Sequence, residues 1–244
     1  AERAGDGATA APVTGAAAKP AAMPPIDASA YECVTTLDRL DHWIAEATKA
    51  GVVGFDTETD SLEAVTARLV GFSLATAPGT ACYVPLAHGG TDMFAEKPEQ
   101  IPLDAALARL KPLLEDASVL KVGQNLKYDM SVLRQHGLTI APFDDTMVMS
   151  FALDAGRQGH GMDELSELWL GHEPISYKSL TGTGKSQIGF AEVPLSDATK
   201  YAAEDADVTL RLWHHLKLRL SPDKVTTVYE LVDRPLVPVL SQME

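Results

Sequence analysis

Three short apolar runs rich in β-forming residues follow one another early in the chain, and their order constrains the fold more than any other feature. The runs are 52–56, 68–75 and 81–86, and Pro78-Gly79 separates the last two. Such short connections join strands that lie next to each other and run in opposite directions. The sequence therefore predicts an antiparallel meander of three strands.

Helical patterns surround these runs. Apolar residues recur at three- and four-residue steps from Leu37 to Ala47, and Gly51 closes this helix. A further strand is expected at 119–124, and Asp144 or Asp145 is expected to cap a helix after it. Strands followed by alternating helices indicate an α/β fold around a mixed sheet. Other helices are expected at 103–114, 128–135, 162–170 and 195–218.

The composition excludes several classes of protein. The 244 residues include 34 acidic and 20 basic side chains, a net charge of -14, which argues against holding nucleic acid by bulk positive charge. The only two cysteines, Cys33 and Cys82, exclude a disulfide scaffold and a four-cysteine zinc site, and they suit a reducing cytoplasm. No apolar run approaches the roughly 18 residues of a membrane span.

The two ends of the sequence differ in composition from its middle. Residues 1–27 are rich in Ala, Pro and Gly and are expected to form a flexible linker. A folded domain is expected over 28–219. A new helical pattern follows Ser221-Pro222, so 220–244 is expected to begin a neighbouring domain. The chain lacks an initiator Met, so we expect it to be a piece of a longer protein.

Asp56 and Glu58 follow the first apolar run. In an extended chain, residues two apart project from the same face. Two carboxylates this close repel each other unless a cation or a proton lies between them, and Mg²⁺ and Mn²⁺ prefer such oxygen ligands. The alternative is a solvated strand end, because the motif is short.

Two further motifs carry an acid at helical spacing. Asn125 and Asp129 are four residues apart and are expected to share a helix face, with a helix cap and an exposed acid as the alternative. Tyr201 and Asp205 have the same spacing on a later helix, which places a phenol beside a carboxylate. The alternative there is a packed tyrosine and a surface aspartate.

Other polar residues are not expected to carry chemistry. Glu204 and Asp207 turn to other faces of the last helix and are expected to be solvated. The run 182–186 is similar to a nucleotide-binding loop, but Ser179 stands where the first glycine is required. His214 and His215 are adjacent on a helix and therefore point to different faces, so they are not expected to be ligands.

Taken in order, the segments 55–62, 121–129 and 201–209 resemble the 3′–5′ exonuclease superfamily with four acidic residues, in its tyrosine-bearing branch. In particular, they are similar to the proofreading domains of bacterial DNA polymerases I. The similarity spans about 52–218. The segment 235–240 resembles the start of the polymerase domain in the same proteins.

This resemblance implies a fold and a reaction. The fold would be ribonuclease-H-like, with a five-stranded mixed sheet flanked by helices. The reaction would be hydrolysis of single-stranded or frayed DNA 3′ ends to nucleoside monophosphates with two divalent ions, Mg²⁺ or Mn²⁺, with Zn²⁺ also possible. Tyr201 and Glu58 would orient the attacking water. The residues implied as metal ligands are Asp56, Glu58, Asp129 and Asp205.

The resemblance also implies substrate contacts and partners. Tyr177 would stack on a base, with core packing as the alternative. The other implied substrate-binding residues are Leu62, Gln124, Asn125 and Tyr128. The partners would be the 3′ end of single-stranded DNA and a polymerase domain in the same chain. The protein would be a monomer in the bacterial cytoplasm, associated with the nucleoid, with no membrane contact, acting in DNA replication and repair.

Two other functions remain open. An RNA 3′ exonuclease resembling ribonuclease D shares the tyrosine-bearing motif but lacks the polymerase-like segment 235–240. A non-catalytic DNA-binding scaffold would keep the acids as a structural cluster, and the net charge of -14 disfavours it.

Overall fold

The computed structural model describes residues 23–89 and 98–244, and every structural statement below concerns these residues. The linker expected at 1–27 lies outside them except for residues 23–27.

The fold is built on a six-stranded mixed sheet in the order β1-β4-β3-β2-β5-β6. The pairs β2–β3 and β3–β4 are antiparallel, which confirms the predicted meander. The pairs β1–β4, β2–β5 and β5–β6 are parallel. The strands are β1 (Glu32–Cys33), β2 (Val52–Thr59), β3 (Leu69–Ala77), β4 (Thr80–Pro85), β5 (Leu120–Gly123) and β6 (Phe143–Asp145).

The expected number of five strands is wrong, because the described sheet has six. The strand β1 contains two residues and pairs with Cys82 and Tyr83 of β4. A strand this short has no alternation of apolar and polar residues, so its pairing depends on tertiary contacts rather than on a local pattern.

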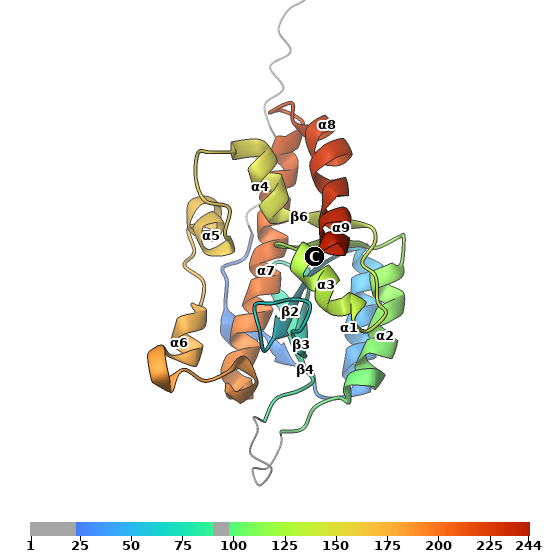
Figure 1. The fold of residues 1–244 in the computed structure, drawn as a ribbon, viewed down its shortest axis with the longest axis vertical. Helices are drawn as coiled ribbons and strands as arrows, with labels where there is room; N and C mark the ends of the chain where they lie inside the picture. The colour runs from blue at the N-terminus through green and yellow to red at the C-terminus, as the bar shows by residue number, and fades with distance from the viewer. Residues whose placement is uncertain (1–22, 90–97) are drawn as a thin grey trace, which may run out of the picture.

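The helices lie on both faces of this sheet (Figure 1). Their bounds are α1 (Leu37–Ala50), α2 (Leu103–Glu115), α3 (Lys127–Arg134), α4 (Thr146–Asp154), α5 (Met162–Leu170), α6 (Tyr177–Thr181), α7 (Leu195–Leu220), α8 (Thr226–Val228) and α9 (Arg234–Met243). Helices α1 and α2 pack together over one face, where Phe55, Phe72 and Leu110 lie in the largest apolar cluster. Helix α7 covers the other face and contacts β2, β3 and β4.

Small residues let α7 approach the sheet closely. A methyl group at Gly54 of β2 would lie 2.5 Å from the carbonyl oxygen of Ala206, so any larger residue would push the helix away. Ala202, Ala203 and Ala206 are fully buried on the facing side of α7. This close approach brings α7 next to the end of β2.

Helix ends follow the predicted signals. Gly51 ends α1 in the left-handed region with φ 71°, as a glycine cap does. Of the two candidates for the cap of α4, the structure selects Asp145, which accepts hydrogen bonds from the backbone N–H groups of Met147 and Val148 at 2.9 and 3.2 Å.

The segment after α7 packs against the same core. It contains α8, a π-helical turn (Tyr229–Asp233) and α9. Tyr229 is fully buried and donates a hydrogen bond to Asp144 at 2.9 Å. Helix α9 lies against α3, where the hydroxyls of Ser131 and Ser241 are 2.8 Å apart. The domain limits expected at 219 and 220 stay a prediction.

Among the described helices, none is long and apolar enough to cross a membrane.

Candidate active site

Three carboxylates from β2 and α7 meet at one end of the sheet. Asp56 and Glu58 stand opposite Ser73 and Gly71 of β3 and project from the same side of β2, as their spacing predicts. Asp205 approaches them from α7. One carboxylate oxygen from each of the three residues lies within 4.8 Å of the others.

Asp129 is buried beside this cluster. It lies in the first turn of α3 with 2% of its surface exposed, so the alternative of an exposed acid is wrong. Its Oδ1 atom accepts hydrogen bonds from the backbone N–H and the hydroxyl of Thr57 at 3.0 and 2.5 Å. The fourth predicted acid therefore contacts the same strand that carries Asp56 and Glu58.

Asn125 does not share a helix face with Asp129, contrary to the prediction. It precedes α3, which begins at Lys127, and has a left-handed backbone with φ 59°. The chain turns sharply there between β5 and α3, and asparagine is among the few residues that tolerate this conformation. Asn125 is exposed and lines the cleft described below.

Two carboxylate oxygens of the acid cluster lack hydrogen-bond partners. The atoms Glu58 Oε1 and Asp205 Oδ1 are buried and accept no hydrogen bond from the residues that the structure describes. Burial, as the largest cause, raises the pKa of all four acids well above their ordinary values, and nearby carboxylates raise those of Asp56, Glu58 and Asp129 further. Buried anions with free oxygens fit a hard divalent cation. The cluster can therefore bind a metal ion.

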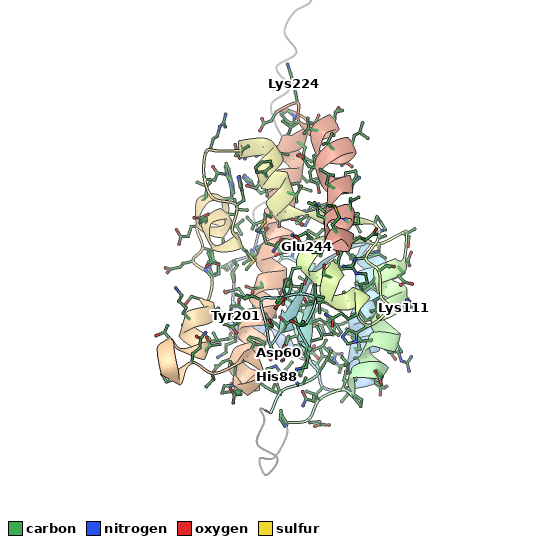
Figure 2. The ribbon with its side chains drawn as sticks, viewed as in Figure 1. Asp60, His88, Lys111, Tyr201, Lys224 and Glu244 are labelled. Atoms are coloured by element: carbon green, nitrogen blue, oxygen red, sulfur yellow. The ribbon has the colours of Figure 1, made fainter. Side chains whose placement is uncertain are left out.

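Tyr201 lies one helical turn before Asp205 on α7, and it is labelled in Figure 2. Burial raises the pKa of its phenol, and the charges of Asp205 and Glu58 raise it further. The phenol therefore stays protonated at neutral pH, so it can donate a hydrogen bond but cannot act as a base.

A cleft of about 700 Å³ opens over these residues. Leu62 lies on its wall and is 98% exposed. Asp60, also on the wall, turns to Arg68 and accepts a hydrogen bond from its Nε at 2.6 Å. The other residues around the cleft are Asp56, Thr57, Glu58, Thr59, Ser61, Gln124, Asn125, Tyr128, Asp129, Tyr177, Lys178, Gln187, Tyr201 and Asp205.

Two of the predicted substrate-binding residues hold the walls of the cleft together. Gln124 donates to the carbonyl of His160 at 2.8 Å and accepts from the hydroxyl of Thr146. The Tyr128 hydroxyl donates to the carbonyl oxygen of Ser61. Their polar groups are therefore engaged within the protein, and a contact of either residue with substrate stays a prediction.

Tyr177 is packed against other aromatic rings and is also partly exposed on the cleft wall. Its ring is stacked on that of Phe190, with centroids 6.3 Å apart and 14° between the planes, and it lies 6.1 Å from the ring of Tyr201. Yet 39% of the residue remains exposed on the cleft wall. The ring is thus held by packing and still has surface free for a ligand.

The expectation that Glu204 and Asp207 are solvated is wrong. They are 2% and 0% exposed. Helix α7 is enclosed by the sheet, by the loop before α6 and by residues 24–33, so a residue turned away from one of these contacts another. The sequence around them is apolar except for the acids, which is the one local signal of a helix buried on all sides.

The two rejected motifs lie in the segment after α6 and in α7. The run 182–186 follows the short helix α6, whereas a nucleotide-binding loop would follow a strand. His214 and His215 lie against the indole rings of Trp213 and Trp169, respectively, and so point to different faces of α7.

Comparisons with known proteins identify relatives. The family described as 3′–5′ exonuclease matches residues 31–221. DNA polymerase I of Rhizobium leguminosarum is 54% identical over 233 residues, which are 90% of this chain and 23% of that protein. DNA polymerase I of Pseudomonas aeruginosa is 42% identical over 221 residues, 88% of this chain and 23% of that protein. The chain thus spans about a quarter of the length of these curated relatives.

Solved structures show the same fold at low sequence identity. Brucella melitensis NrnC with bound Mg²⁺ has a TM-score of 0.61 and 22% identity over 87% of this chain and 90% of that one. Escherichia coli RNase D, an exoribonuclease, has a TM-score of 0.62 and 20% identity over 87% of this chain and 50% of that one. These likenesses confirm the expected ribonuclease-H-like α/β fold.

Proposed function

The chain belongs to the 3′–5′ exonuclease family, and from this premise we propose that it hydrolyses DNA from the 3′ end. The substrate is a single strand or a frayed duplex end, and the products are nucleoside monophosphates. The observation that carries this proposal is the meeting of Asp56, Glu58 and Asp205, of which one oxygen each lies within 4.8 Å of the others. Glu58 and Asp205 each also have a buried oxygen without a hydrogen bond from the described residues.

The four acids are the proposed metal ligands. Asp56, Glu58 and Asp205 would hold one divalent ion, and Asp56 with support from Asp129 would hold a second. The ions would be Mg²⁺ or Mn²⁺, with Zn²⁺ possible. Such ions lower the pKa of water and neutralise charge on a phosphodiester. Asp129 is fixed for its part because Thr57 donates two hydrogen bonds to one of its oxygens.

Tyr201 and Glu58 are proposed to orient the attacking water. The phenol of Tyr201 keeps its proton, because burial and the neighbouring acids raise its pKa, and so it offers a hydrogen-bond donor to the water oxygen. The buried oxygen of Glu58 is available to accept a hydrogen bond from the same water. A donor and an acceptor together would orient a water for attack.

The terminal nucleotide is proposed to lie between Leu62 and Tyr177. Leu62 is almost fully exposed at the wall of the cleft, and the partly exposed ring of Tyr177 offers a surface for stacking. Both contacts accept any base, since every base has a flat apolar face. Gln124, Asn125 and Tyr128 line the same cleft and are proposed to shape the space for the strand end.

The chain is proposed to be the proofreading part of a bacterial DNA polymerase I that acts in replication and repair. Both relatives described above bear that name, and each is about four times as long as the matched region. In this proposal 28–219 is the exonuclease domain, and 220–244 begins the polymerase domain. The parent protein would act as a monomer in the cytoplasm, at the nucleoid.

DNA is favoured over RNA as the substrate. RNase D shares the fold at 20% identity, whereas DNA polymerases I reach 54% and 42%. Turnover of DNA and RNA strands of the same sequence tests this choice. Faster degradation of the RNA strand would overturn it in favour of the ribonuclease.

The test of the function is a labelled DNA single strand incubated with Mg²⁺, with and without a chelator. We expect stepwise shortening from the 3′ end that the chelator abolishes. Asp56→Ala should abolish shortening, whereas Asp197→Ala, at an exposed position on α7, should not. If the protein neither cleaves DNA nor binds Mn²⁺ by calorimetry, the cluster is a structural one and the scaffold alternative is correct.

A further inference from the structure

A buried glutamate ties the loop before α6 to α7. Glu204 accepts a hydrogen bond from His172 Nε2 at 3.0 Å through one oxygen, and from the backbone N–H of Ile175 at 2.6 Å through the other. The loop is also held from α5, because the hydroxyl of Ser166 donates to the carbonyl oxygen of His172 at 2.8 Å. Residues 171–176 are thus fixed between two helices.

This loop leads directly into a wall of the cleft. Helix α6 begins at Tyr177 with Ser176 as its cap, and Tyr177 and Lys178 both line the cleft. With only five residues, α6 is far too short to be stable by itself, so neighbouring segments must hold it in place. The position of the Tyr177 ring therefore depends on how the loop is anchored, together with the packing of the ring against Phe190.

Glu204 differs from the acids that form the site. It lies next to Asp205 in sequence, but it does not line the cleft and does not belong to the cluster of three carboxylates. Both of its oxygens have hydrogen-bond donors, whereas Asp205 keeps a buried oxygen without one. Its environment is that of an anchor and not of a metal ligand.

We propose that Glu204 is a positioning residue for the nucleotide. Its two hydrogen bonds to residues 171–176 hold α6, and with it Tyr177, at a fixed place over the carboxylates. One helix, α7, thereby carries both the acid Asp205 and the anchor of the stacking ring, and it sets the spacing between them. This inference rests on the proposed exonuclease function.

The proposal predicts an effect on strand binding more than on bond cleavage. When the loop is released, the base loses a platform that is ordered before binding, while the carboxylates stay in place. Glu204→Ala should raise KM for a DNA single strand about tenfold, within the range expected for one base stack, and change kcat less than about threefold. Its affinity for Mn²⁺ by calorimetry should match that of Glu204→Gln, which removes the same charge beside Asp205.

Three companion variants sharpen the measurement. Glu204→Gln keeps an oxygen for the Ile175 N–H and an amide that can pair with His172, so its KM should stay within about twofold of the wild type. Glu173→Ala changes an exposed acid in the same loop and serves as the matched control. Tyr177→Ala should raise KM as much as Glu204→Ala does, and the double variant should be no worse than Tyr177→Ala alone.

The double variant separates positioning from general damage. If the KM effects of Glu204→Ala and Tyr177→Ala multiply, Glu204 does not act through the ring and the proposal is wrong. An unchanged KM in Glu204→Ala overturns it as well. Methyl 4-nitrophenyl phosphate has no base, so the proposal requires that Glu204→Ala hydrolyse it as the wild type does, and loss of that activity would contradict the proposal.

Hydrogen exchange supplies a readout that needs no cleavage. Glu204→Ala should speed exchange of the amides in 171–181 and leave those of α3 unchanged. If the wild-type protein cleaves no DNA, the proposed function fails, and the exchange pattern still tests the anchor. Unchanged exchange in 171–181 would overturn the role of Glu204 whatever the activity.

Discussion

Two aspartates on α7, Asp205 and Asp207, lie two residues apart on different faces of the helix and have opposite surroundings. Asp205 is 6% exposed and faces the cleft, where one of its oxygens accepts no hydrogen bond. Asp207 is fully buried and accepts hydrogen bonds from the Tyr31 hydroxyl at 2.7 Å and the Gly79 N–H at 2.9 Å. The Arg211 guanidinium contacts it at 3.0 Å.

This contrast shows that burial alone does not identify a functional acid. A buried carboxylate is costly unless it is paired, and the fold supplies hydrogen-bond donors to both oxygens of Asp207. On the Asp205 face it supplies other carboxylates instead, which repel. The face with unpaired carboxylates is the one that can bind a cation from solution, so missing hydrogen-bond partners distinguish the candidate site better than burial does.

Asp144 extends the comparison to the far end of α7. It is fully buried on β6 and accepts from the Trp213 indole at 2.8 Å and the Tyr229 hydroxyl at 2.9 Å, with Lys217 and Arg234 nearby at 3.0 and 3.1 Å. Like Asp207, it belongs to the scaffold. It joins the sheet to the segment that follows α7.

The largest effect is expected on activity, from substitution of Asp205, whose carboxylate is unpaired. Asp205→Ala removes a proposed metal ligand, whose loss costs several kcal/mol of transition-state stabilisation, so exonuclease activity should fall about 10³-fold or more. The measurement is the initial rate on a labelled single strand in Mg²⁺. A rate within tenfold of the wild type would mean that the two faces do not differ in function.

Substitution of Asp207, whose carboxylate is paired, should lower the stability of the protein. Asp207→Ala leaves the Arg211 guanidinium buried without its carboxylate, which typically destabilises a protein by about 3–5 kcal/mol. Urea unfolding should therefore show a lower midpoint for this variant. Asp205→Ala, measured beside it without metal, should not lower the midpoint, because it removes a source of repulsion. Equal losses in the two variants would contradict the contrast.

A divalent cation should stabilise the wild-type protein through the unpaired face. At 100 times its dissociation constant, a ligand that binds only the folded state adds about 2.7 kcal/mol. The melting temperature should therefore rise with Mg²⁺ or Mn²⁺ and fall back after chelation. Asp197→Ala should keep this response, and Asp205→Ala should lose most of it. An equal rise in both variants would place the cation elsewhere.

A smaller effect is expected from pH in the absence of metal. The folded-state pKa of each of the four clustered acids is raised above its ordinary value, so these four groups bind more protons in the folded protein than in the unfolded chain above about pH 4. Their contribution to stability then falls as pH rises from about 4 through the raised pKa values. The lowered pKa values of His88, His214 and His215 act in the opposite direction below about pH 6.5. Urea midpoints in a chelator at pH 5 and pH 8 test this sign.

The same experiment with Mg²⁺ should reverse the trend, because the cation binds the deprotonated cluster and protons compete with it. Glu58→Gln should flatten the metal-free pH profile by removing one of the titrating groups. A metal-free pH profile of Glu58→Gln that matches the wild-type profile would contradict the raised pKa of this acid.

The sequence predicted the features that depend on local order. Apolar runs and turn residues gave the meander and the helices, because a strand repeats every two residues and a helix about every 3.6. The same periodicity placed Asp56 and Glu58 on one side of β2, and Tyr201 one turn before Asp205 on α7. Asp145 as a helix cap also follows from local chemistry.

Residue spacing failed where the chain leaves regular structure. Asn125 and Asp129 have helical spacing, but the helix begins only at Lys127, so the spacing says nothing about their relative direction. The two-residue strand β1 is too short to show an alternation of apolar and polar residues. In both places the backbone conformation follows from contacts with distant segments.

Only the tertiary structure decided which acids are paired. The sequence shows Glu204, Asp205 and Asp207 as similar neighbours on one helix, and their spacing does not reveal what each face meets. The donors to Glu204 come from residues 172 and 175, and those to Asp207 come from residues 31 and 79 as well as from α7 itself. Pairing of a buried charge depends on packing between segments far apart in the chain, whereas periodicity is a property of the nearest few residues.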